Sequence, residues 1–180
     1  LERQTKAGFV KVIFDAGKPG PAYAMGHVHC DALSFECYLD GVPKIVNCGT
    51  FAYQSDNRLI FKSSKSHSTI IVDKHEQNEC WGSFRVARFG ECVGVSLFED
   101  GVSASYRSMD GVLLKRDIRF DRSRIQIRDK VEGYDGPWQS SYVVPNVHDG
   151  DEWVAKLSYA NRCGEEKTSR IQRKPIAYSS

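Results

Sequence analysis

Short runs of apolar and β-branched residues, separated by Asp-Gly pairs, are the feature that most constrains the fold of this chain. Apolar runs occur at 9–14, 45–46, 69–72 and 125–127, and residues 102–106 alternate between apolar and polar side chains. Such runs are typical of β-strands, whose successive side chains point to opposite faces. No window of about twelve residues has the 3.6-residue period of an amphipathic helix. The sequence therefore predicts a chain built from strands.

The Asp-Gly pairs predict where these strands turn. They occur at 40–41, 100–101, 110–111 and 149–150. Both residues tolerate positive φ, which a type I′ hairpin turn requires at its two central positions. Turn signals at roughly 8–12-residue spacing are typical of antiparallel sandwiches and barrels. We predict an all-β fold, a two-sheet antiparallel β-sandwich.

Length and charge limit the organisation of the chain and its partners. Its 180 residues suit one domain spanning 1–180. The 25 Lys and Arg against 23 Asp and Glu leave a net charge of +2, so no nucleic-acid partner is expected. No apolar run approaches the ~20 residues of a membrane span. The chain opens at Leu1 without an initiator Met or a signal-peptide core, so we expect a piece of a longer polypeptide.

Six cysteines occur at Cys30, Cys37, Cys48, Cys80, Cys92 and Cys163. Their density is far below that of disulfide scaffolds, and no pair has the CxxC spacing of a zinc ribbon. Small buried thiols are the favoured interpretation, because a free Cys packs as a compact hydrophobe. The sequence leaves their disulfide state open.

The densest group of chemically active residues is the segment 26–35, which contains His27 and His29. Two histidines two positions apart on an extended segment point to the same face, so one metal ion or one substrate could meet both. An isolated His-x-His is more often a pair of surface histidines in a loop. A cupin-type site is disfavoured, because Glu36 comes too late after His29 for that pattern.

Two further residues are expected to lie near His29. Asn47 follows the hairpin whose first strand is 33–39, and that hairpin returns Asn47 toward His29. His67 directly precedes an apolar strand. Zinc favours imidazole nitrogen together with carboxylate or carbonyl oxygen. His29, Asn47 and His67 are therefore a candidate set of zinc ligands.

Five blocks of sequence follow one another in a fixed order. They are Asp-Ala-Gly at 15–17, Gly-His-Val-His-Cys-Asp-Ala-Leu-Ser-Phe at 26–35, Asn-Cys-Gly-Thr-Phe-Ala-Tyr at 47–53, the block at 58–69, and Val-Asp-Lys-His-Glu-Gln at 72–77. Together they resemble the pattern of the C-terminal β-sandwich domain of the heparinase II/III-like polysaccharide lyases. The remaining residues fit only as later strands of the sandwich.

The resemblance implies a domain that shares its active site with an N-terminal α/α toroid, none of which lies in these 180 residues. The implied reaction is β-elimination on an acidic, uronic-acid-containing polysaccharide such as a glycosaminoglycan or alginate. The isolated chain is then expected to be inactive. The resemblance also suggests a periplasmic or secreted location.

The resemblance implies roles for particular residues. His27 would face the substrate, with Tyr53 and Arg58 lining the same cleft. Removing the proton next to a uronate carboxylate requires a base and groups that neutralise the growing charge, which suits imidazole and guanidinium side chains. His29, Asn47 and His67 would hold a structural zinc ion that fixes the loop.

This sequence departs from the family pattern at two of these blocks. The family's zinc-binding Asp is Asn47 here, which removes one negative charge from the site. The expected Arg is Lys62, which keeps its charge but loses the bidentate fork. These changes permit a divergent member with altered or lost activity. The alternative function is a non-catalytic carbohydrate-binding or structural sandwich module.

The remaining aromatic and basic residues are predicted to be structural. Trp81, Trp138 and Trp153 are interpreted as core aromatics of the sandwich rather than as platforms for sugars. The basic residues of segment 115–128 are expected on a solvated strand face rather than in a groove for an anionic polymer. These residues are Lys115, Arg116, Arg119, Arg124 and Arg128.

Overall fold

Antiparallel strands make up most of the described chain in this computed structural model. The structure describes residues 1–145 except 22, 51 and 123, together with 156–160 and 166–170. The strands are β1 (Glu2–Thr5), β2 (Gly8–Phe14), β3 (Phe35–Leu39), β4 (Val42–Ile45), β5 (Ile70–Val72), β6 (Cys80–Gly82), β7 (Arg85–Val86), β8 (Glu91–Phe98), β9 (Gly101–Arg107), β10 (Leu113–Phe120), β11 (Ile125–Glu132), β12 (Trp138–Ser140), β13 (Lys156–Ala160) and β14 (Glu166–Arg170). The helical elements are α1 (Arg58–Lys62) and the 3-10 turns η1 (Met25–His27) and η2 (Ser64–Ser66). None of the helices in the described part of the chain has the length and apolarity that crossing a bilayer requires.

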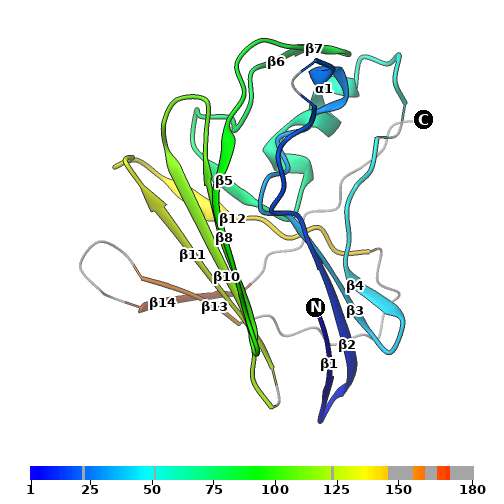
Figure 1. Cartoon of the computed structure of the whole chain (residues 1–180), viewed down its shortest axis with the longest axis vertical. Coiled ribbons are helices and arrows are strands. Elements are labelled where there is room, and N and C mark those ends of the chain that lie inside the picture. Colours follow the sequence, from blue (N-terminus) through cyan, green and yellow to red (C-terminus); the bar gives the residue numbers. More distant parts are fainter. Residues whose placement is uncertain (22, 51, 123, 146–155, 161–165, 171–180) are drawn as a thin grey trace. The chain divides into compact units, whose positions relative to one another are not determined.

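Two four-stranded antiparallel sheets dominate the unit that spans residues 1–145 (Figure 1). One has the strand order β1-β2-β3-β4 and the other β11-β10-β9-β8. Val12 and Phe35 of the first sheet share a buried cluster with Val102 and Ile118 of the second. Burial alternates along β10, as expected for a strand with one face toward a core. The predicted all-β, two-sheet sandwich is confirmed.

The chain also contains a second compact unit, residues 146–180, whose described residues form the antiparallel pair β13-β14. The single domain expected over 1–180 stays a prediction. The turn predicted at 149–150, together with Trp153 and Cys163, lies outside the described residues.

Among the described residues, the chain turns at or next to three of the predicted Asp-Gly pairs, and only Asp40-Gly41 has positive φ at both positions. Asp40-Gly41 joins β3 to β4, and its two residues have φ values of 50° and 79°. Gly111, between β9 and β10, also has positive φ (85°). At the pair 100–101 the turn lies one residue earlier than predicted, because Gly101 is the first residue of β9. A Cβ at Gly101 would overlap the Ile118 carbonyl of β10, so the close approach of these strands requires glycine.

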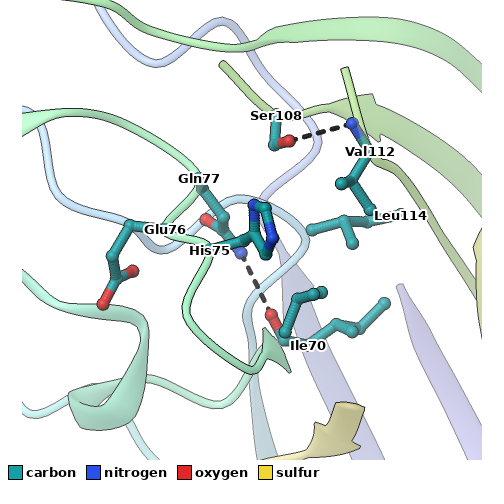
Figure 2. Close-up of a pocket in the computed structure, with 8 residues that line it drawn as sticks. Ile70, His75, Glu76, Gln77, Ser108, Val112 and Leu114 are labelled. Atoms are coloured by element: carbon teal, nitrogen blue, oxygen red, sulfur yellow. Dashed lines mark hydrogen bonds between the residues drawn. The ribbon is translucent and has the colours of Figure 1, made fainter. Parts of the chain in front are cut away.

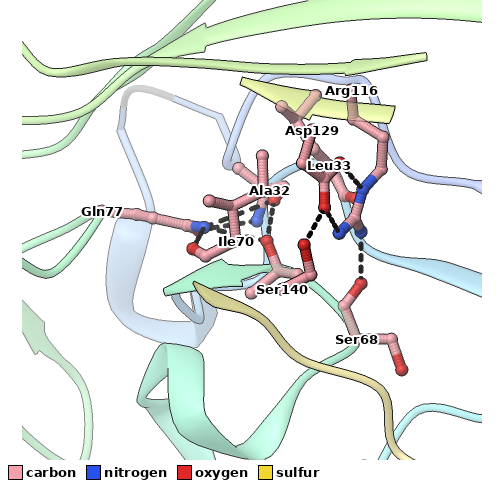
Figure 3. A network of polar contacts seen from close by, with 9 residues as sticks. Ala32, Leu33, Ser68, Ile70, Gln77, Arg116, Asp129 and Ser140 are labelled. Atoms are coloured by element: carbon pink, nitrogen blue, oxygen red, sulfur yellow. Dashed lines mark hydrogen bonds and ion pairs between the residues drawn. The ribbon is translucent and has the colours of Figure 1, made fainter. Parts of the chain in front are cut away.

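A buried ion pair joins the second sheet to two loops (Figure 3). Arg116 of β10 is fully buried, and its Nε and Nη2 each donate to a different carboxylate oxygen of Asp129 on β11 at 2.7 Å. Its Nη1 donates to the carbonyl oxygens of Leu33, at 2.8 Å, and Ser68, at 2.6 Å. Ser140 of β12 donates to the same carboxylate. One guanidinium therefore connects β10, β11 and two segments that lie outside the large sheets.

The solvated face predicted for the basic residues of segment 115–128 is wrong at Arg116. In a strand, Arg116 points to the same face as Leu114 and Ile118, and that face packs against the core. Lys115, on the opposite face, forms a partly exposed ion pair with Glu132 at 3.0 Å, as predicted. The alternation of side chains along β10 shows which residues share a face of the strand. Which of the two faces is buried depends on the part of the fold that packs against it.

Removing the partner of this buried guanidinium is expected to destabilise the fold strongly. Asp129→Ala leaves Arg116 as an uncompensated buried charge, so we expect a loss of about 3–5 kcal/mol in the free energy of unfolding. Urea denaturation followed by circular dichroism measures it. The matched control is Asp121→Ala, which removes an exposed ion pair with Arg124 and should cost less than about 1 kcal/mol. Equal effects of the two substitutions would contradict this account.

Candidate functional site

The two histidines of the His-x-His segment occupy different environments. The 3-10 turn η1 ends at His27, so the segment is not extended at this position as the sequence analysis expected. His27 is exposed to solvent, whereas His29 is buried. The two rings therefore contact different neighbours. The segment has an exposed side built around His27 and a buried side built around His29.

On the exposed side, three aromatic rings and one guanidinium form a cluster. The His27 ring meets Tyr53 and Phe84 edge to face, with a centroid distance of 5.4 Å in each case. Tyr53 and Phe84 stack on each other at 5.8 Å. The Arg58 guanidinium carbon lies 5.4 Å from the Tyr53 ring centroid. The structure thus brings together the three residues that the sequence analysis assigned to the substrate cleft.

An open groove of about 740 Å³ borders this cluster. Its lining includes four exposed aromatic side chains, one cation and a methionine: Tyr23, Trp81, Phe84, Phe89, Arg85 and Met25. Trp81 is 56% exposed, so its prediction as a core aromatic is wrong. It lies on the short two-stranded sheet β6-β7. Trp138 on β12 is half-buried against the core, as predicted.

A second pocket, beside His75, is too closely filled to admit a ligand (Figure 2). It lies against Ile70 of β5 and Leu114 of β10 and has no volume open to a water molecule. His75 itself contacts the Asp110 carboxylate at 3.3 Å near the surface. The groove beside His27 is therefore the better candidate for substrate binding.

On the buried side, His29 and His67 contact each other directly. Nδ1 of His29 lies 3.3 Å from Nε2 of His67, and Nη1 of Arg58 lies 2.8 Å from Nε2 of His29. Nε2 of His67 is also 3.0 Å from the Phe61 carbonyl oxygen. Nδ1 of His67 is buried and has no hydrogen-bond partner. The predicted convergence of His29 and His67 is present.

No arrangement of protons on two neutral imidazoles satisfies all three contacts. When Arg58 donates to Nε2 of His29, the His29 proton lies on Nδ1 and points at Nε2 of His67. That nitrogen must then accept, and its lone pair also faces the Phe61 carbonyl oxygen. A proton on Nε2 of His67 satisfies Phe61 but places two N–H groups opposite each other. Hydrogen bonds alone therefore leave this pair unsatisfied.

Asp31 supplies a third donor at this point, which the sequence analysis missed. Donor atoms of His29, Asp31 and His67 all lie within 4.8 Å of one another. The sequence signal that could have identified Asp31 is its position two residues after His29, the same spacing that separates His27 from His29. Asn47 lies differently: it is exposed, and its Oδ1 accepts a hydrogen bond from the Gly49 N–H at 2.8 Å.

The donor chemistry of this group fits a borderline cation. Burial lowers the pKa of both His29 and His67 to about 4, and burial raises the pKa of Asp31 to about 6. At neutral pH the group is therefore two neutral imidazoles and a carboxylate, the ligand types that zinc prefers. The 3.3 Å between the imidazole nitrogens is close to the ~3.3–3.4 Å edge of a tetrahedron with ~2.0–2.1 Å metal–nitrogen bonds. Coordination through Nδ1 puts the His29 proton on Nε2, so the Arg58 N–H must turn away.

Arg58 lies beneath the exposed cluster rather than at its surface. It is only 1% exposed, and its Nε and Nη2 have no hydrogen-bond partner. Its contacts are His29 on one side and the Tyr53 ring on the other. Arg58 therefore links the buried histidine pair to the aromatic cluster.

Comparisons with known proteins point to one family. The family model described as heparinase II/III-like, C-terminal, matches residues 3–162. Two solved structures of heparinase III, the BT4657 gene product, are similar in fold. The form with methylated lysines has a TM-score of 0.58 and 16% identity, covering 84% of this chain and 25% of that one. The other structure has a TM-score of 0.59 and 15% identity, and the match covers 89% of this chain and 27% of that one. The chain thus spans about a quarter of the length of these structures. No curated protein matches it.

The buried histidines predict the response of the metal-free protein to acid. Between about pH 4 and 6.5 the unfolded chain binds more protons on His29 and His67 than the folded chain does, so acidification favours unfolding. Asp31 has the opposite effect between pH 3.8 and about 6, because its raised pKa makes the folded chain bind more protons there than the unfolded chain. Its single contribution is smaller than that of the two histidines. We expect Tm in a chelating buffer to fall over this range.

The variant His67→Gln tests whether the buried histidines cause this fall in Tm. It should flatten the dependence of Tm on pH, because one of the two acid-sensitive groups is lost. His75→Gln, which changes a histidine nearer the surface, is the matched control and should keep the wild-type dependence. Identical pH profiles for wild type and His67→Gln would show that the buried pair is not the cause.

Proposed function

Because the chain belongs to the heparinase II/III-like C-terminal family, we propose that it is the C-terminal domain of a lyase that cleaves uronic-acid-containing polysaccharide by β-elimination. In this proposal His27 acts in a site shared with an N-terminal helical toroid of the same polypeptide. One observation carries the assignment of His27. Its exposed imidazole packs edge to face against two stacked aromatic rings at the border of an open groove.

The geometry around His27 suits the chemistry of β-elimination. The reaction removes the proton next to the uronate carboxylate and protonates the departing sugar oxygen, so it needs a proton-transfer group that reaches the substrate. The edge-to-face contacts with Tyr53 and Phe84 stabilise the observed orientation of the His27 ring. Tyr53 is half-exposed beside it and belongs to the same proposed site. Arg58 acts as a positioning residue through Tyr53 and His29.

The groove supplies the features that binding an acidic polysaccharide requires. The exposed faces of Tyr23 and Trp81 offer flat apolar surfaces on which sugar rings pack. The Arg85 guanidinium carbon lies 4.7 Å from the Trp81 ring centroid and brings a positive charge to the same surface. A guanidinium pairs well with carboxylate or sulfate groups. This combination supports an anionic sugar chain as the substrate.

A structural zinc ion is the second part of the proposal. His29 and His67 are its ligands, with a carboxylate oxygen of Asp31 as the third donor. Asn47, at the family's Asp position, is exposed, and its Oδ1 accepts a hydrogen bond from the Gly49 N–H. Bound zinc would hold the His29 imidazole and so steady the segment that presents His27.

Metal analysis tests this part. Protein purified without chelators should contain near-stoichiometric zinc by elemental analysis. Asp31→Asn should weaken zinc affinity by about 10-fold or more, since one anionic ligand is lost. The control Asp73→Asn changes an exposed carboxylate outside the donor group and should leave affinity unchanged. Absence of zinc from both the wild type and Asn47→Asp would refute the zinc site.

Kinetics of the full-length enzyme test the role of His27. His27→Ala should lower turnover about 10²-fold or more, in line with the loss of an acid–base group. The isolated 180-residue chain should be inactive, because the reacting groups are divided between two domains. The assay follows the ultraviolet absorbance of the unsaturated uronate end on a panel of acidic polysaccharides. His75→Ala, at a histidine outside the site, is the control.

Two results would change the assignment. Clear turnover by the isolated chain would overturn the shared site. A full-length enzyme that is indifferent to His27→Ala would favour the alternative, a non-catalytic carbohydrate-binding or structural module.

A further inference from the structure

The short helix α1 buries its two cations and exposes its aliphatic side chains. Arg58 and Lys62, at its two ends, are buried, whereas Leu59 and Ile60 are exposed. Residues four positions apart lie on the same face of a helix, so both cations point toward the interior. Arg58 contacts His29 there. A buried ammonium group is unfavourable unless its N–H groups are satisfied, so the contacts of Lys62 indicate its role.

The side chain of Lys62 joins two backbone segments. Its Nζ donates to the Gly26 carbonyl oxygen at 3.0 Å and, more weakly, to the Ser83 carbonyl oxygen at 3.5 Å. Gly26 directly precedes His27, and Ser83 directly precedes Phe84. The His27 and Phe84 rings meet edge to face at 5.4 Å. One ammonium group therefore connects the two backbones whose next side chains pack against each other.

The backbone of Lys62 holds the other end of the segment 26–30. Its carbonyl oxygen accepts a hydrogen bond from the Cys30 N–H at 2.7 Å. The segment that carries both histidines is therefore attached to one residue at both ends. The contact at Cys30 does not require the lysine side chain, whereas the contact at Gly26 does. A substitution of Lys62 is thus expected to release the Gly26 end and to leave the other end attached.

Gly26 also lies directly against the segment to which Lys62 joins it. A Cβ at Gly26 would lie 2.9 Å from the Phe84 carbonyl oxygen, which leaves no room for a side chain. This close approach of the two backbones accompanies the contacts of the His27 ring with Phe84 and Tyr53. The place of His27 in the aromatic cluster therefore depends on how closely Gly26 lies against Phe84.

We propose that Lys62 is a positioning residue, which holds the His27 imidazole in the aromatic cluster through the carbonyl oxygens of Gly26 and Ser83. Lys62 is fully buried, so it acts on a substrate only through His27. The inference rests on the proposed function, because it requires that His27 takes part in the reaction. The arginine of the family pattern could fill the same role, since a guanidinium has N–H groups for both carbonyl oxygens.

Steady-state kinetics of the full-length enzyme test the proposal. Lys62→Met keeps a long side chain but removes its donors. It should lower kcat about 10-fold or more with KM changed less than about 2-fold, because a catalytic group displaced by about 1 Å can cost up to 10²-fold. Lys62→Arg should retain most of the wild-type kcat. The control Val102→Ala, in the core of the sandwich, should lower Tm and leave kcat unchanged below that Tm.

A double-mutant cycle separates this inference from the proposed function. In the His27→Ala background, Lys62→Met should lower kcat by less than about 2-fold, because residues that act as a unit are not additive. A full-length enzyme indifferent to His27→Ala would refute the proposed function. If His27→Ala is slow, a wild-type kcat for Lys62→Met would overturn the positioning role alone. An undiminished effect of Lys62→Met in the double variant would do the same.

Proton NMR of this chain tests the geometry without any activity. The ring protons of His27 lie close to two aromatic rings, whose ring currents displace their resonances. Lys62→Met should move these resonances toward the values of a free histidine, whereas those of His75, beside a different ring, should stay in place. Gly26→Ala should also move them, and it retains the test if Lys62→Met does not fold. Unchanged His27 resonances in every folded variant would overturn the proposal.

Discussion

The Arg116 guanidinium, buried between the sheets, is the interaction on which the candidate site depends. A buried cation is unfavourable unless it is paired and its N–H groups are satisfied, and Asp129 together with two carbonyl oxygens meets both needs. Those carbonyls belong to Leu33, two residues after Asp31, and Ser68, the neighbour of His67. The same ion pair that joins β10 to β11 therefore anchors the two segments that carry the buried donor group.

The segments around the site have little regular structure, and polar side chains hold them in place of sheet hydrogen bonds. Gln77 accepts from the Ala32 N–H at 2.8 Å and donates to the Thr69 hydroxyl at 3.0 Å (Figure 3). Thr69 in turn donates to the Ala32 carbonyl oxygen. Loops with buried backbone must satisfy their polar groups in this way. This explains why Gln77 and Thr69 are buried although they are polar.

The site is divided between an exposed and a buried side, with Arg58 between them. His27 and Tyr53 face solvent at the groove, whereas His29 and His67 are shielded from it. Exposed imidazole and aromatic groups suit contact with a polymer, and shielded donors suit a structural role. The guanidinium of Arg58 lies between the two sides, 2.8 Å from His29 Nε2 and 5.4 Å from the Tyr53 ring centroid.

The sequence by itself determined the strands and the Asp40-Gly41 hairpin, because period-two patterns and turn residues act locally. It also predicted the approach of His67 to His29, because the ordered blocks identify a family. Tertiary structure decided the burial of Arg116, the exposure of Trp81 and the approach of Asp31 to the histidine pair. Alternation tells which residues share a face of one strand, but not whether another layer covers that face. A layer covers the face of β10 that carries Arg116, while Trp81 on the short β6-β7 sheet stays in solvent. Likewise, one 3-10 turn ending at His27 was enough to separate two histidines that an extended chain would have kept together.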